Sequence, residues 1–296
     1  MKTLVFYSLL MVLFFGCKAQ PNPSFTVQKN NNSLLWEISG NGLKKPSFLF
    51  GTFHLLCKDD IHFSDQLLKA VKSCDEIYME IDMDDPSTML SGMMYMNMRG
   101  DTTLADLYTP KEYDRLKNYF SDTLKMPLMI LQKAKPYFLV ALLYPRMMNC
   151  SSPSGVEEAL VKIAKEDKKE IQGLETVQFQ ASVFDSIPYK WQAQELLKNI
   201  DSFSVNKKEF ETMLGFYKNQ QMDSLKTMLG KSEFGSDKYD DLLLNDRNKK
   251  WVKKLDTIFN KESVFIAVGA GHLVGEKGLI NLLKEQGYKV QPLENK

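Results

Sequence analysis

The sequence has few of the residues that mark the commonest specialised classes of protein. Its 296 residues include only three histidines and four cysteines, and 38 basic residues are balanced by 37 acidic ones. Without a basic excess the chain lacks the electrostatic footprint of nucleic-acid binding. Hydrophobic residues make up 44% of the chain and charged residues 25%, which is typical of a globular protein with a substantial core. We therefore expect a folded protein without a nucleic-acid partner.

Several familiar catalytic motifs are also absent. There is no Gly-x-Ser-x-Gly, no His-Glu-x-x-His and no Walker A sequence, so a nucleophile-elbow esterase, a zincin or a P-loop enzyme is not supported. The stretch Gly269-Ala-Gly271-His-Leu-Val-Gly275 imitates a dinucleotide-binding loop. Its third glycine comes one residue late, and the chain ends before a ribose-binding acid could follow.

The chain contains no apolar run long enough to cross a bilayer. The longest, from residue 4 to 15, follows Lys2 and has the length of a signal-peptide core. It ends in Gly16-Cys17, which resembles the lipobox of bacterial lipoproteins. We expect residues 1–17 to be a lipoprotein leader, Cys17 to be lipidated and attached to the membrane, and residues 18–24 to be a tether. The alternative is an ordinary secretion signal cleaved after Cys17.

Three cysteines remain once Cys17 is set aside, namely Cys57, Cys74 and Cys150. At most one disulfide can form among them, so no disulfide framework holds the fold. His54-x-x-Cys57 could be half of a zinc site, but a small buried thiol at Cys57 is the favoured interpretation.

Two of the three histidines follow the same local pattern. Ser47-Phe-Leu-Phe-Gly51-Thr-Phe-His54-Leu and Val264-Phe-Ile-Ala-Val-Gly269-Ala-Gly-His272-Leu both read as an apolar strand that ends at Gly-x-x-His. Ligands in open α/β sheets gather at the carboxyl ends of strands, and glycine permits a close backbone approach there. A single such histidine is more often structural. Two matching ones predict the halves of one site.

The order of periodic segments predicts an α/β protein with a mixed, mainly parallel central sheet. We expect a hairpin over 25–28 and 34–38, strands over 47–51, 76–82, 169–173, 264–269 and 289–293, and helices over 64–73 and 278–286. The section 86–260 is mostly helical, with candidate helices over 87–98, 110–120, 128–147, 156–167, 177–185, 190–200, 205–229 and 239–260. Pro136 should kink or interrupt the third of these. Residues 25–296 are expected to form a single domain, because no low-complexity linker divides them.

Carboxylates at strand ends complete the candidate chemistry. Imidazole with carboxylate suits a divalent transition metal, and the best-placed acids are Glu80 and Glu175, each at the end of a predicted strand. Either could instead cap a helix or face solvent from a loop. Arg247 lies one turn before Trp251 on an apolar helix, as a partner for a buried acid or as a clamp for a substrate oxyanion. These two roles stay open.

The combination of motifs resembles the TraB/GumN family, which includes the Tiki metalloproteases. Gly51-Thr-Phe-His54 and Gly269-Ala-Gly-His272 resemble that family's two Gly-x-x-His motifs, and Arg247-Asn248 is similar to its Arg-Asn before the last strand. Gly173-Leu-Glu175-Thr176 with Gln178 looks like a Leu-Glu-Thr-x-x-Gln motif with one residue missing. Two further departures are Gln220-Gln221 where the family has Gly-Asp, and Val274 where many members have proline.

The resemblance implies a fold akin to the erythromycin-esterase and ChaN group, built from two Gly-x-x-His strand–helix units. It also implies metal-dependent peptide cleavage, with manganese or cobalt favoured and zinc as a further option. Our leading hypothesis is a lipid-anchored hydrolase of the bacterial cell envelope, in which His54, Glu80 and His272 bind the metal. Glu175 would be the general base and Arg247 the oxyanion partner. The alternative is an envelope protein that binds a ligand or metal, such as haem iron, without turnover.

Overall fold

A computed structural model describes residues 24–229 and 239–296. The predicted leader over 1–17 and nearly all of the tether over 18–24 lie outside the described residues. Within the described part of the chain, no helix has both the length and the apolar character needed to cross a membrane.

The central sheet is mainly parallel, as predicted. In the described residues six strands lie in the order β6 (Ile171–Gly173), β4 (Glu76–Met79), β7 (Val264–Gly269), β2 (Ser47–Thr52), β1 (Leu35–Ser39) and β8 (Lys289–Pro292). The first four pair in parallel, whereas β1 runs antiparallel to both of its neighbours. The parallel strands β2 and β7 are almost wholly buried, which explains why both read as continuous apolar runs.

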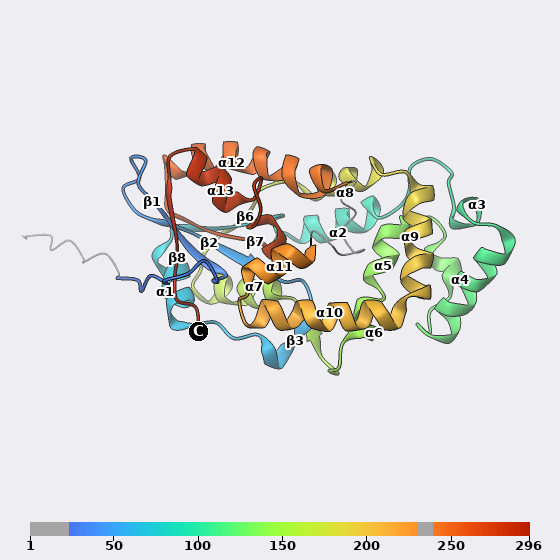
Figure 1. Cartoon of the computed structure of the whole chain (residues 1–296). Helices are drawn as coiled ribbons and strands as arrows, with labels where there is room; N and C mark the ends of the chain where they lie inside the picture. Colours follow the sequence, from blue (N-terminus) through green and yellow to red (C-terminus); the bar gives the residue numbers. More distant parts are fainter. Residues whose placement is uncertain (1–23, 230–238) are drawn as a thin grey trace, which may run out of the picture.

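Helices cover both faces of this sheet. In Figure 1, α12 (Asp246–Phe259) and α13 (Leu279–Glu285) lie above it, and α1 (Asp65–Ser73) and α7 (Val156–Glu166) lie below it. The helix α1 begins where the sequence predicts, because the side chain of Ser64 accepts a hydrogen bond from the Leu67 amide and so caps the first turn.

The middle of the chain adds a helical section, which extends from the sheet to the right of Figure 1, where it has its own apolar cluster. Its helices are α2 (Pro86–Tyr95), α3 (Leu104–Leu107), α4 (Pro110–Asp122), α5 (Pro136–Ala141), α6 (Tyr144–Met147), α8 (Val177–Asp185), α9 (Tyr189–Asp201), α10 (Phe203–Lys218) and α11 (Met222–Leu229). A second apolar cluster fills the space around the sheet. Phe53, which directly precedes His54, contacts both clusters.

The strands that carry the two Gly-x-x-His motifs are direct neighbours. β2 pairs with β7 so that Gly51 lies opposite Val268 and Thr52 lies opposite Gly269. Both motifs therefore leave the sheet at the same edge. A side chain at Gly51 would place its Cβ 3.1 Å from Leu273 and 3.2 Å from Ala270, so glycine there allows the two motifs to pack this closely.

Several predicted elements have different boundaries. The 25–38 hairpin is wrong: β1 pairs with β2 and β8, and Val27 forms only an isolated bridge with Leu293. The predicted 128–147 helix is interrupted at Pro136, as expected, and is split into a 3-10 turn, α5 and α6. The 205–229 helix breaks where Gln220 adopts a positive φ of 56°. The last long helix begins as a π-helix, Asp241–Asn245.

Candidate functional site

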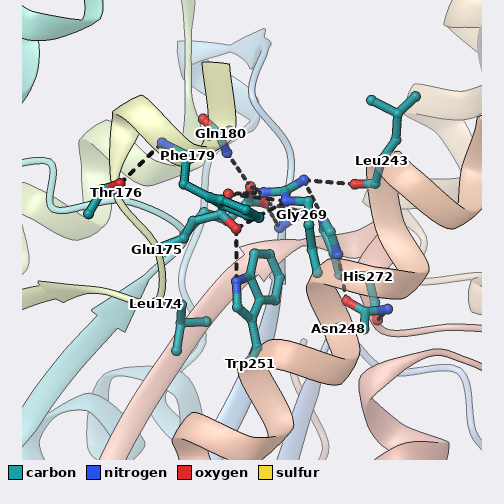
Figure 2. A network of polar contacts seen from close by, with 12 residues as sticks. Leu174, Glu175, Thr176, Phe179, Gln180, Leu243, Asn248, Trp251, Gly269 and His272 are labelled. Atoms are coloured by element: carbon teal, nitrogen blue, oxygen red, sulfur yellow. Dashed lines mark hydrogen bonds and ion pairs between the residues drawn. The ribbon is translucent and has the colours of Figure 1, made fainter. Parts of the chain in front are cut away.

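Four predicted site residues meet in one buried polar network at the carboxyl edge of the parallel strands (Figure 2). Glu80 directly follows β4 and Glu175 follows β6. His272 ends the 3-10 turn after β7, and Arg247 reaches across from the first turn of α12. Parallel strands end at the same edge, so polar residues placed just after apolar strands converge there.

Arg247 is the centre of this network. Its Nη2 donates to Glu80 Oε2 at 2.6 Å and to Glu175 Oε1 at 2.7 Å, and its Nε donates to Glu175 at 3.1 Å. Its Nη1 donates to the Leu243 carbonyl and contacts His272 Nε2 at 3.1 Å. All three nitrogens are therefore engaged, and one guanidinium balances two buried carboxylates. Of the two roles that the sequence left open, the contacts match a partner for buried acids.

The contacts of His272 define its tautomer. Asn248 Nδ2 donates to the carbonyls of His272 and Lys277, so Asn248 Oδ1 is the acceptor that faces His272 Nδ1 at 2.7 Å. Nδ1 therefore carries the proton, and Nε2 accepts from Arg247. Burial lowers the pKa of His272 to about 3, which makes the ring neutral at pH 7.

Glu80 stays ionised in spite of its burial. Burial alone raises its pKa, but the charges of His272, Arg247 and His54 and the hydrogen bond from the Gly269 amide lower the pKa to about 2. Because His272 is neutral at pH 7, Arg247 is the main cation beside this carboxylate under those conditions. Gln180 Nε2 donates to Oε2 at 2.9 Å, and the Gly269 amide donates to Oε1 at 3.0 Å.

Glu175 lies against an aromatic wall. Trp251 Nε1 donates to Glu175 Oε2 at 3.0 Å, and the Trp251 ring also packs against His272, with ring centroids 4.4 Å apart. Burial raises the pKa of Glu175 more than its contacts with Arg247 lower it. A carboxylate with a raised pKa is suited to proton transfer near neutral pH.

His54 lies apart from this network and has a different partner. Its Nδ1 pairs with Glu157 Oε1 at 2.8 Å, and 76% of its side chain is exposed. The hydrogen bond with Glu157 raises the pKa of His54 to about 9. A cavity of about 290 Å³ is lined by His54, Glu157, Glu80 and Gln180 among others. The cavity thus connects His54, which follows β2, with the network around Arg247.

The donor types fit a divalent ion, and two of the three predicted ligands are suitably close. His272 Nε2 and Glu80 Oε1 lie 3.7 Å apart, within the ~4.2 Å that two ligand bonds of about 2.1 Å can span. Yet in the described chain no three His, Cys, Asp or Glu side chains are grouped closely enough to hold an ion. His54 is not gathered with the other two, and Arg247 contacts both of them.

Sequence reasoning missed four contacting residues. The sequence places Glu157 only within a predicted helix, although an acid at a helix start after Gly155 is a usable signal. The partner of Glu80 is Gln180, two residues beyond the Gln178 that the motif indicated. Asn248 and Trp251 lie close to Arg247 in the sequence, but no local pattern indicates their contacts with His272 and Glu175.

The buried free thiol expected at Cys57 is wrong. Cys57 forms a disulfide with Cys150, and Cys74 is the free, buried cysteine among the described residues. Cys57 therefore has no thiolate to offer to a zinc site with His54. Spacing along the chain could not reveal this bond, because its two cysteines are 93 residues apart.

The fold and the network at its strand ends are those of an α/β protein with a polar site on a parallel sheet. The chain belongs to the TraB/PrgY/gumN family, which it matches over residues 34–292. No solved structure is significantly similar.

The chain is also similar to individual curated proteins. It is 20% identical to Metalloprotease TIKI1 of Danio rerio over 93% of this chain and 65% of that protein. It is 20% identical to the Metalloprotease TIKI homolog of Nematostella vectensis over 90% of this chain and 68% of that protein. It is 23% identical to Uncharacterized protein YbaP of Shigella flexneri, over 80% of this chain and 88% of that protein. The chain thus spans about two thirds of the length of the two metalloproteases.

Proposed function

We propose that this protein is a lipid-anchored hydrolase of the bacterial cell envelope that depends on a divalent metal and cleaves peptide bonds. The observation that carries the proposal is the pair of His272 Nε2 and Glu80 Oε1, 3.7 Å apart at the edge of a parallel sheet. Family membership and the two relatives named as metalloproteases support peptide cleavage. The YbaP relatives support a bacterial setting.

In this proposal His54, Glu80 and His272 hold the metal, with manganese or cobalt favoured over zinc. A bound divalent ion would lower the pKa of a water molecule and polarise a substrate carbonyl. Asn248 keeps the proton of His272 on Nδ1, which leaves Nε2 as the donor atom. Gln180 and the Gly269 amide hold the Glu80 carboxylate in place.

Glu175 and Arg247 act beside that centre. Burial raises the pKa of Glu175, which favours its use as the general base. Arg247 is the oxyanion partner, and to act so it must release one of its present acceptors, since each of its nitrogens is engaged. The substrate enters the 290 Å³ cavity beside His54.

One observation favours a second candidate function. Arg247 already contacts Nε2, the unprotonated ring nitrogen of His272, and one oxygen of Glu80. This is the arrangement expected in a pocket without a metal. The second candidate is therefore the envelope protein that binds without turnover, and this contact favours a small ligand over the metal or haem iron that the same alternative includes.

Metal content and peptide cleavage together test the proposal. The purified protein should contain manganese, cobalt or zinc by elemental analysis and cleave a peptide library, and a chelator should abolish cleavage. His54→Ala, His272→Ala and Glu80→Gln should each lose most of the metal, because a site without one ligand cannot complete its coordination. The exposed His62→Ala is the matched control and should retain it. Equal metal content in all folded variants would overturn the metal centre, and metal binding without cleavage would favour the binding protein.

A further inference from the structure

A cavity of about 630 Å³ is bordered by α2, by α8 and by the segment that follows α2. The charged residues of its lining are Arg99, Lys135 and Asp185, and its apolar residues include Met98 and Phe179. Two cations and one carboxylate leave this lining with a surplus of one positive charge. The cavity is therefore suited to a ligand that joins an anionic group to an apolar one.

Arg99 is the surplus cation, because Asp185 has enough partners without it. The Asp185 carboxylate accepts from the Tyr189 hydroxyl at 2.6 Å and pairs with Lys135 at 2.9 Å. The side chain of Lys135 is only 1% exposed, and a buried ammonium needs such a counterion. Asp185 thus balances Lys135. The pair of Arg99 Nε with Asp185, at 3.0 Å, adds a second cation to a charge that is already balanced.

The backbone at Arg99 is held in place, although its side chain is 71% exposed. Its amide donates to the Tyr189 hydroxyl at 3.0 Å, and the amide of Met98 donates to the carbonyl of Lys133 at 2.7 Å. Within the described residues neither terminal nitrogen of Arg99 forms a hydrogen bond. An exposed ion pair adds little stability. A fixed guanidinium with two terminal nitrogens available is instead suited to binding a carboxylate through two hydrogen bonds.

This cavity adjoins one that Glu175 borders. The second cavity, of about 520 Å³, is lined by Glu175 and shares Tyr95, Thr176 and Gln178 with the first. Thr176 directly follows Glu175 and caps α8, as Figure 2 shows. A peptide that reaches Glu175 can therefore extend through the shared lining to Arg99.

We propose that Arg99 binds a carboxylate of the substrate, while Met98 and Phe179 contact the apolar part of the same substrate residue. The carboxylate is either the C-terminus of a peptide or the side chain of an acidic residue. The inference rests on the proposed function, because it takes the substrate as a peptide. Arg99 determines specificity and takes no part in bond cleavage, so the carboxylate site itself does not depend on a metal.

Two variants of the full-length protein remove different properties of Arg99. Arg99→Gln removes the charge and leaves Asp185 with its two other partners, so the fold should persist. Arg99→Lys keeps the charge but loses the fork of terminal nitrogens. Arg115→Gln is the matched control, because Arg115 is 51% exposed, pairs with Asp201 and borders none of the three cavities described above.

Binding is measured by NMR titration with probes that need no cleavage. N-acetylmethionine carries a main-chain carboxylate, N-acetylmethionine amide carries none, and the α-amide of N-acetylglutamate carries a side-chain carboxylate. In the wild type the Nε–H signal of Arg99, assigned by its loss in Arg99→Gln, should shift with a carboxylate probe and not with N-acetylmethionine amide. The carboxylate probe that binds more tightly identifies the source of the group.

Backbone amide signals that shift with that probe give its affinity in each variant. We expect Arg99→Gln to bind it about three- to tenfold more weakly than the wild type does. Arg99→Lys should recover part of this loss, and Arg115→Gln should match the wild type. For a peptide that the wild type cleaves, Arg99→Gln should raise KM and leave kcat nearly unchanged, because the contact is made equally before and during bond cleavage.

The outcomes separate this inference from the proposed function. The inference is overturned if no carboxylate probe binds, if N-acetylmethionine and its amide bind equally, or if Arg99→Gln binds as the wild type does. It is also overturned if Arg115→Gln loses as much affinity, since surface charge in general would then explain the binding. Peptide cleavage in any of these cases leaves the proposed function standing. If a carboxylate binds at Arg99 but no peptide is cleaved, the proposed function fails, and Arg99 belongs to the alternative that binds a small ligand without turnover.

Discussion

At the scale of single residues, the two motif histidines have opposite surroundings. His272 is buried, neutral and bonded at both ring nitrogens, whereas His54 is largely exposed and bonded to a carboxylate. Their matching sequences predict a matching strand exit, and both do leave neighbouring strands at one edge. The state of each ring depends instead on side chains from other segments, namely Asn248 and Arg247 for one and Glu157 for the other.

The titration of His272 and Glu80 predicts that stability falls in acid. Burial lowers the pKa of His272 from 6.5 to about 3, so unfolding takes up a proton between those pH values. Its contribution to stability is complete above pH 6.5 and is lost toward pH 3, with a slope approaching ~1.4 kcal/mol per pH unit. The pKa of Glu80 is lowered from 4.5 to about 2, so this carboxylate adds a further loss of stability as the pH falls from 4.5 to 2. The pKa of His54 is instead raised to about 9, so its contribution to stability is lost as the pH rises from 6.5 through 9.

Urea unfolding at pH 7, 6 and 5 measures this slope. His272→Gln should flatten the change in unfolding free energy between pH 6.5 and 5, because the variant has no ring to protonate on unfolding. His62 is exposed, so His62→Gln is the control and should keep the wild-type slope. An unchanged slope in His272→Gln would contradict the burial of a neutral ring.

Arg247 should also be essential for stability. Arg247→Met would leave Glu80 and Glu175 buried with no cation beside them, and breaking a buried pair in this way costs about 3–5 kcal/mol. Lys249→Met is the matched control on the same helix, since Lys249 forms an exposed pair with Asp246 and should lose less than about 1 kcal/mol. Chemical denaturation gives both values, and similar losses in the two variants would show that the network does not hold the fold.

At the scale of elements, the short ladder of β3 (Leu56–Cys57) and β5 (Pro153–Ser154) links the sheet to the helical section. It joins the loop after β2 to the segment before α7, and the disulfide reinforces it. Disulfides persist in oxidising compartments, which agrees with the proposed location in the cell envelope. The sequence signal for these two strands is weak because each has only two residues.

The disulfide should contribute strongly to stability. It closes a loop of 93 residues, and removing a native disulfide of this kind typically costs about 2–5 kcal/mol. Cys57→Ser/Cys150→Ser should therefore show that loss in urea unfolding. Dithiothreitol should reproduce it in the wild type and have no further effect on the double variant. A wild type that is insensitive to the reductant, although its thiols are shown to be free, would refute the prediction.

At the scale of the whole molecule, the parallel topology gathers residues from distant segments. Glu80, Glu175 and His272 follow three neighbouring strands, β4, β6 and β7, and Arg247 comes from the helix that precedes β7. The helical section lies beside this edge and contributes Gln180 from α8. The candidate site therefore depends on the order of the parallel strands, although each of its residues lies in a short local motif.

The lipid anchor is a prediction about the molecule in its cell. Because the apolar run that we interpret as a leader is followed by Gly16-Cys17, Cys17→Ala should release the protein from the membrane fraction into the soluble fraction. Fractionation and immunoblotting measure the shift, with Cys74→Ala as the control that should remain in the membrane fraction. Membrane association that persists unchanged in Cys17→Ala would place the anchor elsewhere.

Local signals were sufficient for most of the longer elements and for the strand ends at which the candidate site lies. Apolar runs ending in glycine marked β2 and β7, Ser64 marked the start of α1, and Pro136 marked a helix break. These signals depend on near neighbours along the chain, so they can be read without a structure. The same local reasoning paired 25–28 with 34–38 wrongly, because strand partners are chosen by the whole sheet.

The sequence by itself determined which polar residues stand at strand ends, and therefore that Glu80, Glu175 and His272 share one edge of a parallel sheet. Only the tertiary structure decided their partners: Arg247 between two acids, Asn248 on His272, Glu157 on His54 and Cys57 bonded to Cys150. The physical reason is the range of the interactions. Strand and helix patterns arise from neighbours a few residues apart, whereas a buried charge selects its partner from whatever side chains the packing of distant segments brings within reach.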